Sequence, residues 1–200
     1  MITSDFGEQT RICIDSAPVA ERYWARISGV GAPSLNGCVS VAEFGQEIML
    51  AEILTTLSLP PDPPAKPECN QCGACITACP GQALNGDGTL DARKCISYIT
   101  IEHHGSFTKK QKSIIERGHP AGHLFGCDIC RLVCPLNNHS QKNIVSNTDE
   151  VLLTAEDAVT MTHEEFNRLF QGSAVKRCRF EGFHRNALAI VTPTVDAPGK

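Results

Sequence analysis

The sequence predicts an α+β protein of three segments, of which the middle one is rich in cysteine. A short strand pattern near the N-terminus is followed by amphipathic helical patterns. Residues 58–67 contain five prolines and predict a stiff extended linker, after which most of the eleven cysteines occur. We therefore expect segments at residues 1–60, 61–140 and 141–191, and a disordered tail at 192–200.

The first segment is expected to contain one strand and two helices. Arg11 to Asp15 form the strand, which ends on its acidic residue. Ser16 and Pro18 suit the N-cap and first turn of a helix that ends near Gly29. A second helix is predicted over Glu47 to Leu57, because apolar residues recur there at helical spacing.

The third segment is expected to be helical as far as Ile190. Thr162 and Glu165 have the spacing of a capping box, in which two side chains satisfy free backbone groups at the start of a helix. The apolar residues that follow them supply a face for that helix to bury.

Composition and charge limit the classes of function. The chain has 18 Lys and Arg against 22 Asp and Glu, a formal net charge of −4, so no global basic field indicates nucleic acid. No apolar stretch approaches the roughly 18 residues of a membrane span, and the first residues lack an export signal. We expect a cytoplasmic monomer without a membrane partner, in which clustered cysteines ligate metal rather than form disulfides.

Four cysteines form a run that is typical of bacterial ferredoxins. Cys69, Cys72, Cys75 and Cys79, followed by Pro80, read C-x2-C-x2-C-x3-C-P, in which the fourth cysteine ligates the other cluster of a two-cluster protein. The spacings of two place three thiolates around one tight loop, where they can bind adjacent irons of a cuboidal cluster. The fourth thiolate then points elsewhere.

A second run lacks only its first cysteine. Cys127, Cys130 and Cys134, followed by Pro135, read C-x2-C-x3-C-P, and Cys95 can supply the missing ligand. Exchange of the fourth ligands between the runs predicts two crossed sets. We expect two 4Fe-4S clusters, cluster 1 on Cys69, Cys72, Cys75 and Cys134, and cluster 2 on Cys79, Cys95, Cys127 and Cys130.

A pair of zinc sites is the alternative, because C-x2-C pairs also bind zinc. Four-ligand zinc sites do not explain why the x3 spacing followed by proline occurs twice, so the pattern favours clusters. The other cysteines, Cys13, Cys38 and Cys178, are expected to be packing residues. His103 and His104 would point to opposite faces of an extended segment and are expected at the surface or around the ligands.

Two further stretches, in which Cys95 is the only expected cluster ligand, make the pattern more specific. They read Asp-Ser-Ala-Pro-Val-Ala-Glu-Arg at 15–22 and Cys-Ile-Ser-Tyr-Ile-Thr-Ile-Glu at 95–102, the latter preceded by Leu-Asp-Ala-Arg-Lys. With the first cysteine run and Gly-Cys-Asp-Ile-Cys at 126–130, they resemble epoxyqueuosine reductase, the cobalamin and iron–sulfur enzyme of tRNA queuosine synthesis. The resemblance covers about residues 10–136 and, more loosely, 166–190.

The resemblance implies a partial α/β cobalamin-type domain, a dicluster ferredoxin-like domain and the start of a helical, HEAT-like region. It implies an oxidoreductase that removes the epoxide oxygen of epoxyqueuosine in tRNA, with cobalamin reduced by the two clusters. Asp15 matches the family's active-site aspartate, the proposed proton donor to the leaving oxygen. Judged by its position alone, Asp15 suits the role of a helix cap equally well.

The chain departs from the family pattern in its first segment. Leu35 stands where the family has a basic residue, and Phe44-Gly45-Gln46-Glu47 replaces a Gly-Ser-aromatic pattern. Family members also carry a long segment before the Asp-Ser-Ala-Pro-Val motif and further helical repeats at the other end. The chain is therefore expected to be a fragment, a split gene product or a reduced homologue.

Two functions fit the sequence. The first is an epoxyqueuosine reductase-like enzyme that acts on tRNA and draws on an unidentified low-potential electron donor. The second is a dicluster ferredoxin-type electron carrier that has lost the catalytic half, and cobalamin binding distinguishes the two. The related reductive dehalogenases match less well, because the chain has no twin-arginine signal. The basic residues that could contact tRNA phosphates, or form solvated loops, are Lys109, Lys110, Lys112, Lys176, Arg177, Arg179 and Arg185.

Overall fold

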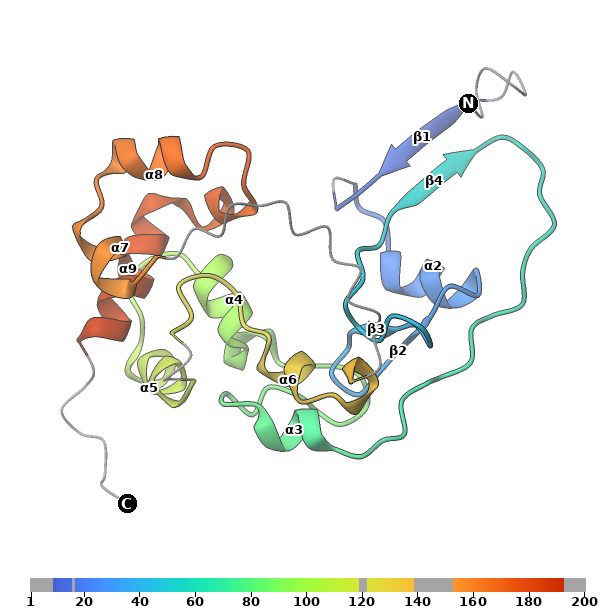
Figure 1. The fold of residues 1–200 in the computed structure, drawn as a ribbon, viewed down its shortest axis with the longest axis horizontal. Coiled ribbons are helices and arrows are strands. Elements are labelled where there is room, and N and C mark those ends of the chain that lie inside the picture. Colours follow the sequence, from blue (N-terminus) through green and yellow to red (C-terminus); the bar gives the residue numbers. More distant parts are fainter. Residues whose placement is uncertain (1–8, 16, 119–121, 139–152, 193–200) are drawn as a thin grey trace.

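Short strands and helices alternate along the chain in the computed structural model, which describes residues 9–15, 17–118, 122–138 and 153–192. The mixed helix-and-strand class is therefore confirmed. Figure 1 shows two strands near the N-terminus at one side, the cysteine-rich segment in the middle and the C-terminal helices at the other side. The predicted tail lies outside the described residues, except for Thr192.

Strands β1 (Thr10–Cys13) and β4 (Glu52–Thr55) form an antiparallel ribbon in which Ile12 pairs with Ile53. The first strand was predicted and is confirmed, although it ends two residues before Asp15. The helix predicted over Glu47 to Leu57 is wrong, because β4 occupies its centre. The apolar spacing suits a helix, but pairing with β1 satisfies the backbone and accommodates branched side chains on a pleated surface.

Helix α2 (Glu21–Ile27) ends just before Gly29, as predicted, but begins later than expected. Its N-cap is Ala20, so Pro18 precedes the helix instead of occupying its first turn, and Ser16 lies outside the described residues. A tight turn, in which Val19 N donates to Ala17 O at 2.7 Å, holds this stretch out of the helix. Strands β2 (Ala32–Pro33) and β3 (Val39–Ser40) follow and pair with each other.

The proline-rich stretch at residues 58–67 is extended, as predicted. It runs along the outside of the molecule from β4 toward the first cysteines (Figure 1). Ala65 N donates to Arg26 O at 2.8 Å, which ties the stretch to the end of α2.

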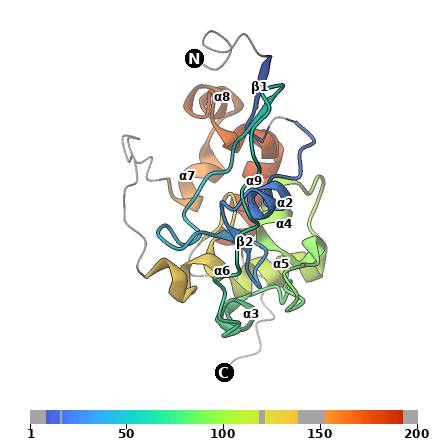
Figure 2. The same cartoon turned by 90° about the vertical axis from the view of Figure 1, so that its right-hand side faces the viewer.

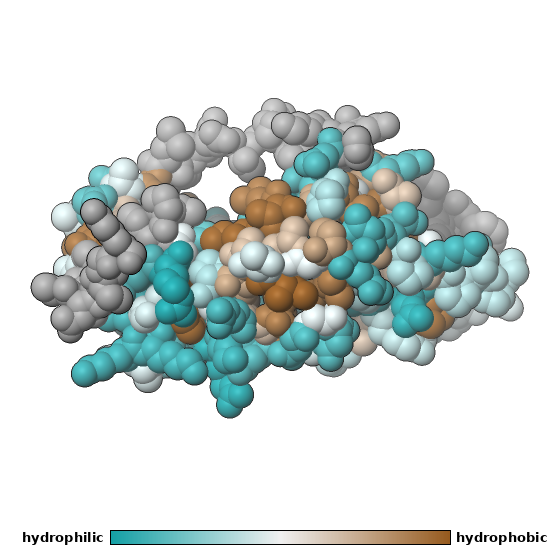
Figure 3. Space-filling model, turned by 90° about the horizontal axis from the view of Figure 1, so that it is seen from below, coloured by the Kyte–Doolittle hydropathy of each residue, from teal (hydrophilic) through white to brown (hydrophobic). Residues whose placement is uncertain are grey.

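Short helical elements carry the cysteine-rich segment. They are α3 (Ala74–Ala78), η1 (Ala92–Lys94), α4 (Ile96–Ile101), α5 (Lys109–Arg117), α6 (Ile129–Leu132) and η2 (Pro135–Asn137), where η denotes a 3-10 helix. Helix α3 packs against α6, and α4 packs against α5. Seen from below, apolar surface gathers in the middle of the molecule, where this segment lies (Figure 3).

The C-terminal part is helical, as predicted. Helix α7 (Ala155–Thr160) precedes α8 (His163–Leu169), and the capping box of Thr162 and Glu165 is formed at the start of α8. The 3-10 helix η3 (Ala174–Cys178) leads into α9 (Arg179–Val191), which packs against α4, α5 and α7 (Figure 2). None of the described helices combines the length and apolar character needed to cross a bilayer.

Helix α9 joins two hydrophobic cores. Its Ala189 packs with Ile96, Ile99, Ile114 and Ile115. On another side, Phe183 and Ala187 pack with Ala158, Phe166 and Cys178. The first of these cores contains residues from both sides of the expected segment boundary at residue 140. The boundary itself stays a prediction.

Asn186 connects α9 to the cysteine-rich segment inside these cores. Its side chain is fully buried, and Nδ2 donates to the carbonyl oxygens of Thr100 and Leu124, both at 2.8 Å. Arg185 beside it donates to the carbonyl oxygens of His103, at 2.7 Å, and Gly105, at 2.9 Å. The two residues fix the C-terminal helices against α4 and the loop after it.

We expect Asn186→Ala to lower the free energy of unfolding by about 2 kcal/mol, because it removes a donor from one buried and one partly buried carbonyl oxygen. Urea unfolding under anaerobic conditions measures the change. Asn85→Ala is a matched control, because it removes an exposed hydrogen bond to Thr89 and should cost less than about 0.5 kcal/mol. Equal losses in the two variants would contradict the role given to Asn186.

Candidate iron–sulfur centre

Four cysteines from both runs line one small cavity. Cys69, Cys72 and Cys75 come from the first run, and Cys134 comes from the end of the second. The opposite wall is formed by the loop around Asn36 and by Gln46. These are the four cysteines expected for cluster 1, and chain folding brings Cys134 to them across more than half of the cysteine-rich segment.

The other four cysteines are Cys130 and three that lie within its electrostatic reach. The pKa of Cys130 is raised to about 12, mainly by burial and additionally by the charges of Cys38, Cys127, Cys79 and Cys95. Burial also raises the pKa of Cys127, which again lies within the electrostatic reach of Cys95 and Cys79. The members of the set expected for cluster 2 therefore lie within electrostatic reach of Cys130.

Local backbone geometry separates each fourth cysteine from its own run. Cys79 and Cys134 are both extended, with ψ of 113° and 122°, and each precedes a proline, which disfavours the helical conformation before it. Gly81 then passes so close to Lys94 that an added Cβ would overlap the Lys94 carbonyl oxygen. This close approach holds Cys79 near the Cys95 segment rather than near Cys69.

A tight turn gathers the first three cysteines. Gly73 has φ of +75°, a left-handed conformation that glycine adopts without steric cost, and it starts helix α3. Cys72 and Cys75 lie on either side of this turn and face the same cavity. Because the chain turns at Gly73, the C-x2-C spacing places Cys72 and Cys75 on the same cavity.

The thiols of the protein without metal are stabilised in their protonated form. Burial is the main cause that raises the pKa of Cys75, Cys127 and Cys130. Bound iron needs thiolates, so loading of these sites releases protons. Among the described residues, no three His, Cys, Asp or Glu side chains converge closely enough to hold a single metal ion. A cuboidal cluster does not need such convergence, because its four thiolates bind four different irons.

Polar side chains that the sequence did not reveal join the first segment to the second cysteine run. Asn36 and Gln46 exchange side-chain hydrogen bonds of 2.9 and 3.1 Å, and Asn36 Nδ2 also donates to Cys130 O at 3.3 Å. Gln46 N donates to Asn137 Oδ1 at 2.7 Å, and Asn137 Nδ2 donates to Arg131 O at 2.7 Å. In the sequence, Gln46 stands out only as a departure from the family pattern.

Cys38 lies within electrostatic reach of Cys134 in one set and Cys130 in the other, which its place in the sequence does not indicate. Burial raises its pKa, Arg131 and Arg22 oppose this, and Cys134 is within its electrostatic reach. Arg131 is itself held by Asp128 at 3.0 Å and by Glu47 at 3.1 Å. Cys13 and Cys178 are buried, as expected of packing residues.

Asp15 lies on the surface, outside the cysteine cavity. It follows β1 with φ of +48°, its side chain is 88% exposed, and Arg177 Nη1 lies 3.8 Å from its Oδ2. Arg177 Nε also pairs with Glu102 Oε1 at 2.7 Å. Because Ala20 occupies the N-cap of α2, Asp15 is not the cap of that helix.

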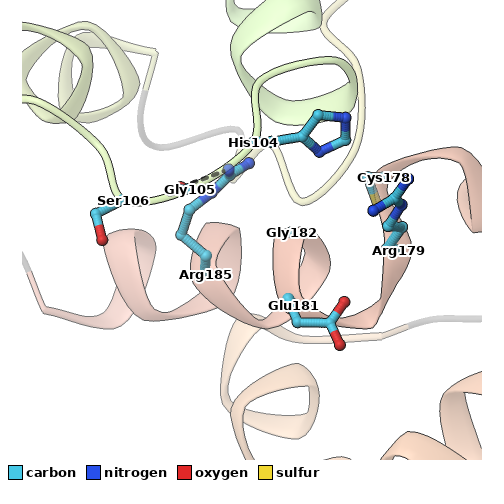
Figure 4. Close-up of a pocket in the computed structure, with 8 residues that line it drawn as sticks. All are labelled: His104, Gly105, Ser106, Cys178, Arg179, Glu181, Gly182 and Arg185. Carbon is cyan, nitrogen blue, oxygen red and sulfur yellow. Dashed lines mark hydrogen bonds between the residues drawn. The ribbon is translucent and has the colours of Figure 1, made fainter.

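The basic residues of the C-terminal part have different surroundings. Figure 4 shows an open cavity of about 420 Å³ between the loop at 104–106 and the start of α9. Arg185 stacks its guanidinium on Phe107, 4.1 Å from the ring centre, and donates to backbone carbonyls. It therefore connects α9 to the loop that follows α4. Arg179 is exposed at the rim with φ of +59°. Of the three lysines at positions 109, 110 and 112, Lys112 donates from Nζ to Thr192 O at 3.5 Å.

Comparisons with known proteins agree with this geometry. Residues 68–137 match the family model of the 4Fe-4S double cluster binding domain. An epoxyqueuosine reductase of Cyclobacterium marinum is 38% identical over 92% of the chain and 59% of its own length. One of Gloeobacter violaceus is 32% identical over 97% of the chain and 62% of its own length. The chain is similar to the epoxyqueuosine reductases over nearly all of its length. It spans about three-fifths of the length of these curated relatives.

Solved structures of epoxyqueuosine reductase have the same fold. One with an epoxyqueuosine-modified tRNA stem loop superposes with a TM-score of 0.85 at 26% identity, covering 95% of this chain and 50% of the other. The Bacillus subtilis epoxyqueuosine reductase gives a TM-score of 0.77 at 26% identity, over 92% and 48% of the two chains. In that structure the loop of a catalytic aspartate is swung out of the active site.

Proposed function

We propose that the chain binds two 4Fe-4S clusters and delivers electrons in an epoxyqueuosine reductase-type reaction, the reduction of the epoxide of epoxyqueuosine in tRNA to queuosine. The observation that carries this proposal is the gathering of eight cysteines into two groups of four. Cluster 1 is held by Cys69, Cys72, Cys75 and Cys134, and cluster 2 by Cys79, Cys95, Cys127 and Cys130. The match of residues 68–137 to a double cluster domain supports it.

The crossed arrangement suits the passage of electrons between the clusters. Each run contributes to both sites, and α3 and α6, which belong to the two runs, pack against each other. A short separation of the clusters is inferred from this shared scaffold, and the burial that raises the pKa of Cys127 and Cys130 partly shields the cluster 2 site from bulk water. The clusters would receive electrons one at a time from an external low-potential donor.

Asp15 is proposed as the proton donor to the epoxide oxygen. Reduction of an epoxide to an alkene with loss of oxygen as water consumes two electrons and two protons, so a group must protonate the leaving oxygen. Asp15 matches the family's active-site aspartate in sequence, and Arg177 anchors its exposed position. The swung-out aspartate loop of the Bacillus subtilis enzyme supports a mobile role for such a residue.

Cobalamin, which the resemblance implies, does not fit the described residues by themselves. Asp15 stands 88% exposed at the surface rather than in an enclosed pocket that could hold a corrin beside it. No step is therefore assigned to cobalamin in this chain.

The alternative function is a dicluster electron carrier without catalytic activity. The exposure of Asp15 favours this alternative, because it leaves the reacting site open. The deciding experiment adds cobalamin, a reductant and tRNA carrying epoxyqueuosine to the anaerobically reconstituted chain. A base-off corrin spectrum and formation of queuosine support the reductase; reducible clusters with neither result support the carrier.

A tRNA partner is proposed from the relatives and from exposed basic residues such as Lys109, Lys110 and Arg179. If they contact phosphates, the affinity for the tRNA stem loop should fall steeply between about 50 and 200 mM salt. Fluorescence anisotropy with a labelled stem loop measures this dependence. An affinity that does not change with salt would contradict contacts of this kind.

A further inference from the structure

A network of buried polar side chains forms one wall of the cavity that is expected to hold cluster 1. Ser34, Asn36 and Gln46 line this cavity together with the four cysteines of that set. Each of the three is only 5% exposed, and Ser40, which bonds to two of them, is fully buried. Buried polar groups are normally paired, so the partner of each proton in this network can be identified in turn.

The two amide side chains have no proton left for the cavity. Asn36 Nδ2 donates to Gln46 Oε1 at 2.9 Å and to Cys130 O at 3.3 Å. Gln46 Nε2 donates to Asn36 Oδ1 and to Ser40 Oγ, both at 3.1 Å. An amide nitrogen carries two protons, so both nitrogens are fully used.

The two hydroxyl groups, in contrast, have one proton more than they can use between themselves. Ser34 Oγ and Ser40 Oγ lie 2.6 Å apart and share one hydrogen bond. Two hydroxyls carry two protons, of which this bond takes one. Among the residues that the structure describes, neither oxygen has a further acceptor within hydrogen-bond distance. One hydroxyl proton is therefore available to a group that binds in the cavity.

The available proton belongs to Ser34. If Ser34 donated to Ser40, the spare proton would lie on a fully buried hydroxyl that does not line the cavity, which costs free energy. If Ser40 passes its proton to Ser34, the spare proton lies on the hydroxyl of a residue that does line it. The backbone holds Ser34 in place, because its N donates to Cys38 O and its O accepts from Gly37 N, both at 2.8 Å.

We propose that Ser34 Oγ donates a hydrogen bond to a sulfur of cluster 1 and thereby raises the reduction potential of that cluster. A reduced cluster gains one electron from the external donor, and a hydrogen bond to its sulfur stabilises the added negative charge. The proton stays on Ser34, and no covalent bond forms or breaks. This inference rests on the two clusters of the proposed function.

The order of the hydrogen bonds strengthens this donor. Gln46 donates to Ser40, and Ser40 donates to Ser34, so each bond polarises the next hydroxyl. Gln46 is also one of the residues at which the sequence departs from the family pattern. The adjustment of the potential is therefore expected to be a property of this chain.

The test is a redox titration of the full chain, reconstituted with iron and sulfide and followed by electron paramagnetic resonance. Ser34→Ala should keep about eight irons and shift one of the two one-electron steps to lower potential. We expect an about tenfold lower ratio of reduced to oxidised cluster at a fixed potential, which corresponds to about 59 mV. The other step should not move. Electron–nuclear double resonance should show a deuterium-exchangeable proton coupled to the reduced cluster of the unmodified chain, which Ser34→Ala lacks.

Two further variants separate proton donation from packing. Ser40→Ala leaves the proton of Ser34 available, so it should shift the same step by less than Ser34→Ala does. A role in packing alone predicts the opposite order, because Ser40 is the more deeply buried residue. Ser28→Ala, the control, removes an exposed hydroxyl that donates to Trp24 O at 2.8 Å and should leave both steps unchanged.

The outcomes distinguish this inference from the proposed function. Unchanged potentials in a Ser34→Ala chain that holds about eight irons would overturn the role of Ser34 alone. Equal shifts of both steps, or loss of iron from this variant, would likewise make Ser34 a structural residue. An unmodified chain that takes up no iron would overturn the proposed function together with this inference.

Discussion

Cys79→Ala is expected to lower the iron content from about eight to about four per chain, although Cys79 belongs to the same run as three ligands of cluster 1. The structure places Cys79 within the electrostatic reach of Cys130, a member of the other set. A second cysteine lost from the same cluster should then cost no further iron. Iron and acid-labile sulfide analysis after anaerobic reconstitution measures the effect.

Double variants make this test independent of spectroscopic assignment. Cys79→Ala/Cys127→Ala removes two ligands of cluster 2 and should keep about four irons. Cys79→Ala/Cys75→Ala removes one ligand from each cluster and should lose nearly all iron. If each run held its own cluster, the two results would be reversed. Cys178→Ala, at a buried cysteine among aromatic residues, is the control and should keep about eight irons.

Asp15→Asn should lower the rate of queuosine formation by about two to four orders of magnitude, because an amide cannot donate a proton to the leaving oxygen. The substitution keeps the shape of the side chain, and at an exposed position it should leave stability and iron content unchanged. The rate is measured on tRNA carrying epoxyqueuosine under single-turnover conditions. Asp62→Asn, at an exposed carboxylate of the proline-rich stretch, is the control.

A rate for Asp15→Asn within about threefold of the unmodified chain would remove Asp15 from the chemistry. Arg177→Gln provides a further check, because Arg177 contacts Asp15 and Glu102 but cannot supply the proton. An exposed ion pair contributes about 1 kcal/mol or less, so this variant should lose less than about tenfold. If the rate fell further in Arg177→Gln than in Asp15→Asn, Arg177 would contribute more than Asp15 to the reaction.

Part of the grouping of the cysteines could be predicted because some of its causes are local. Ligand spacing, the glycine between Cys72 and Cys75, and the prolines after Cys79 and Cys134 are all visible in the sequence, and each acts on its neighbours. The capping box at Thr162 belongs to the same class of signal. Such features bias the local backbone on which each thiol is carried.

The remaining features depend on partners far apart in the chain. Residues 52–55 have helical spacing but become a strand because β1, some forty residues earlier, offers a pairing edge. Gln46 bonds to Asn137, and Asn186 bonds to Thr100, across 91 and 86 residues. A polar side chain in the sequence carries no sign of such a partner. The exposure of Asp15 could not be foreseen either, because its motif indicates chemistry rather than surroundings.

Analysis of iron, zinc and acid-labile sulfide in the anaerobically reconstituted chain tests the central claim most directly. The two crossed sets of cysteines predict about eight irons and about eight sulfides per chain, with an absorption band near 400 nm that bleaches on reduction. About two zinc ions per chain and no acid-labile sulfide would contradict the claim, because zinc binds the same thiolates without inorganic sulfide and cannot accept an electron.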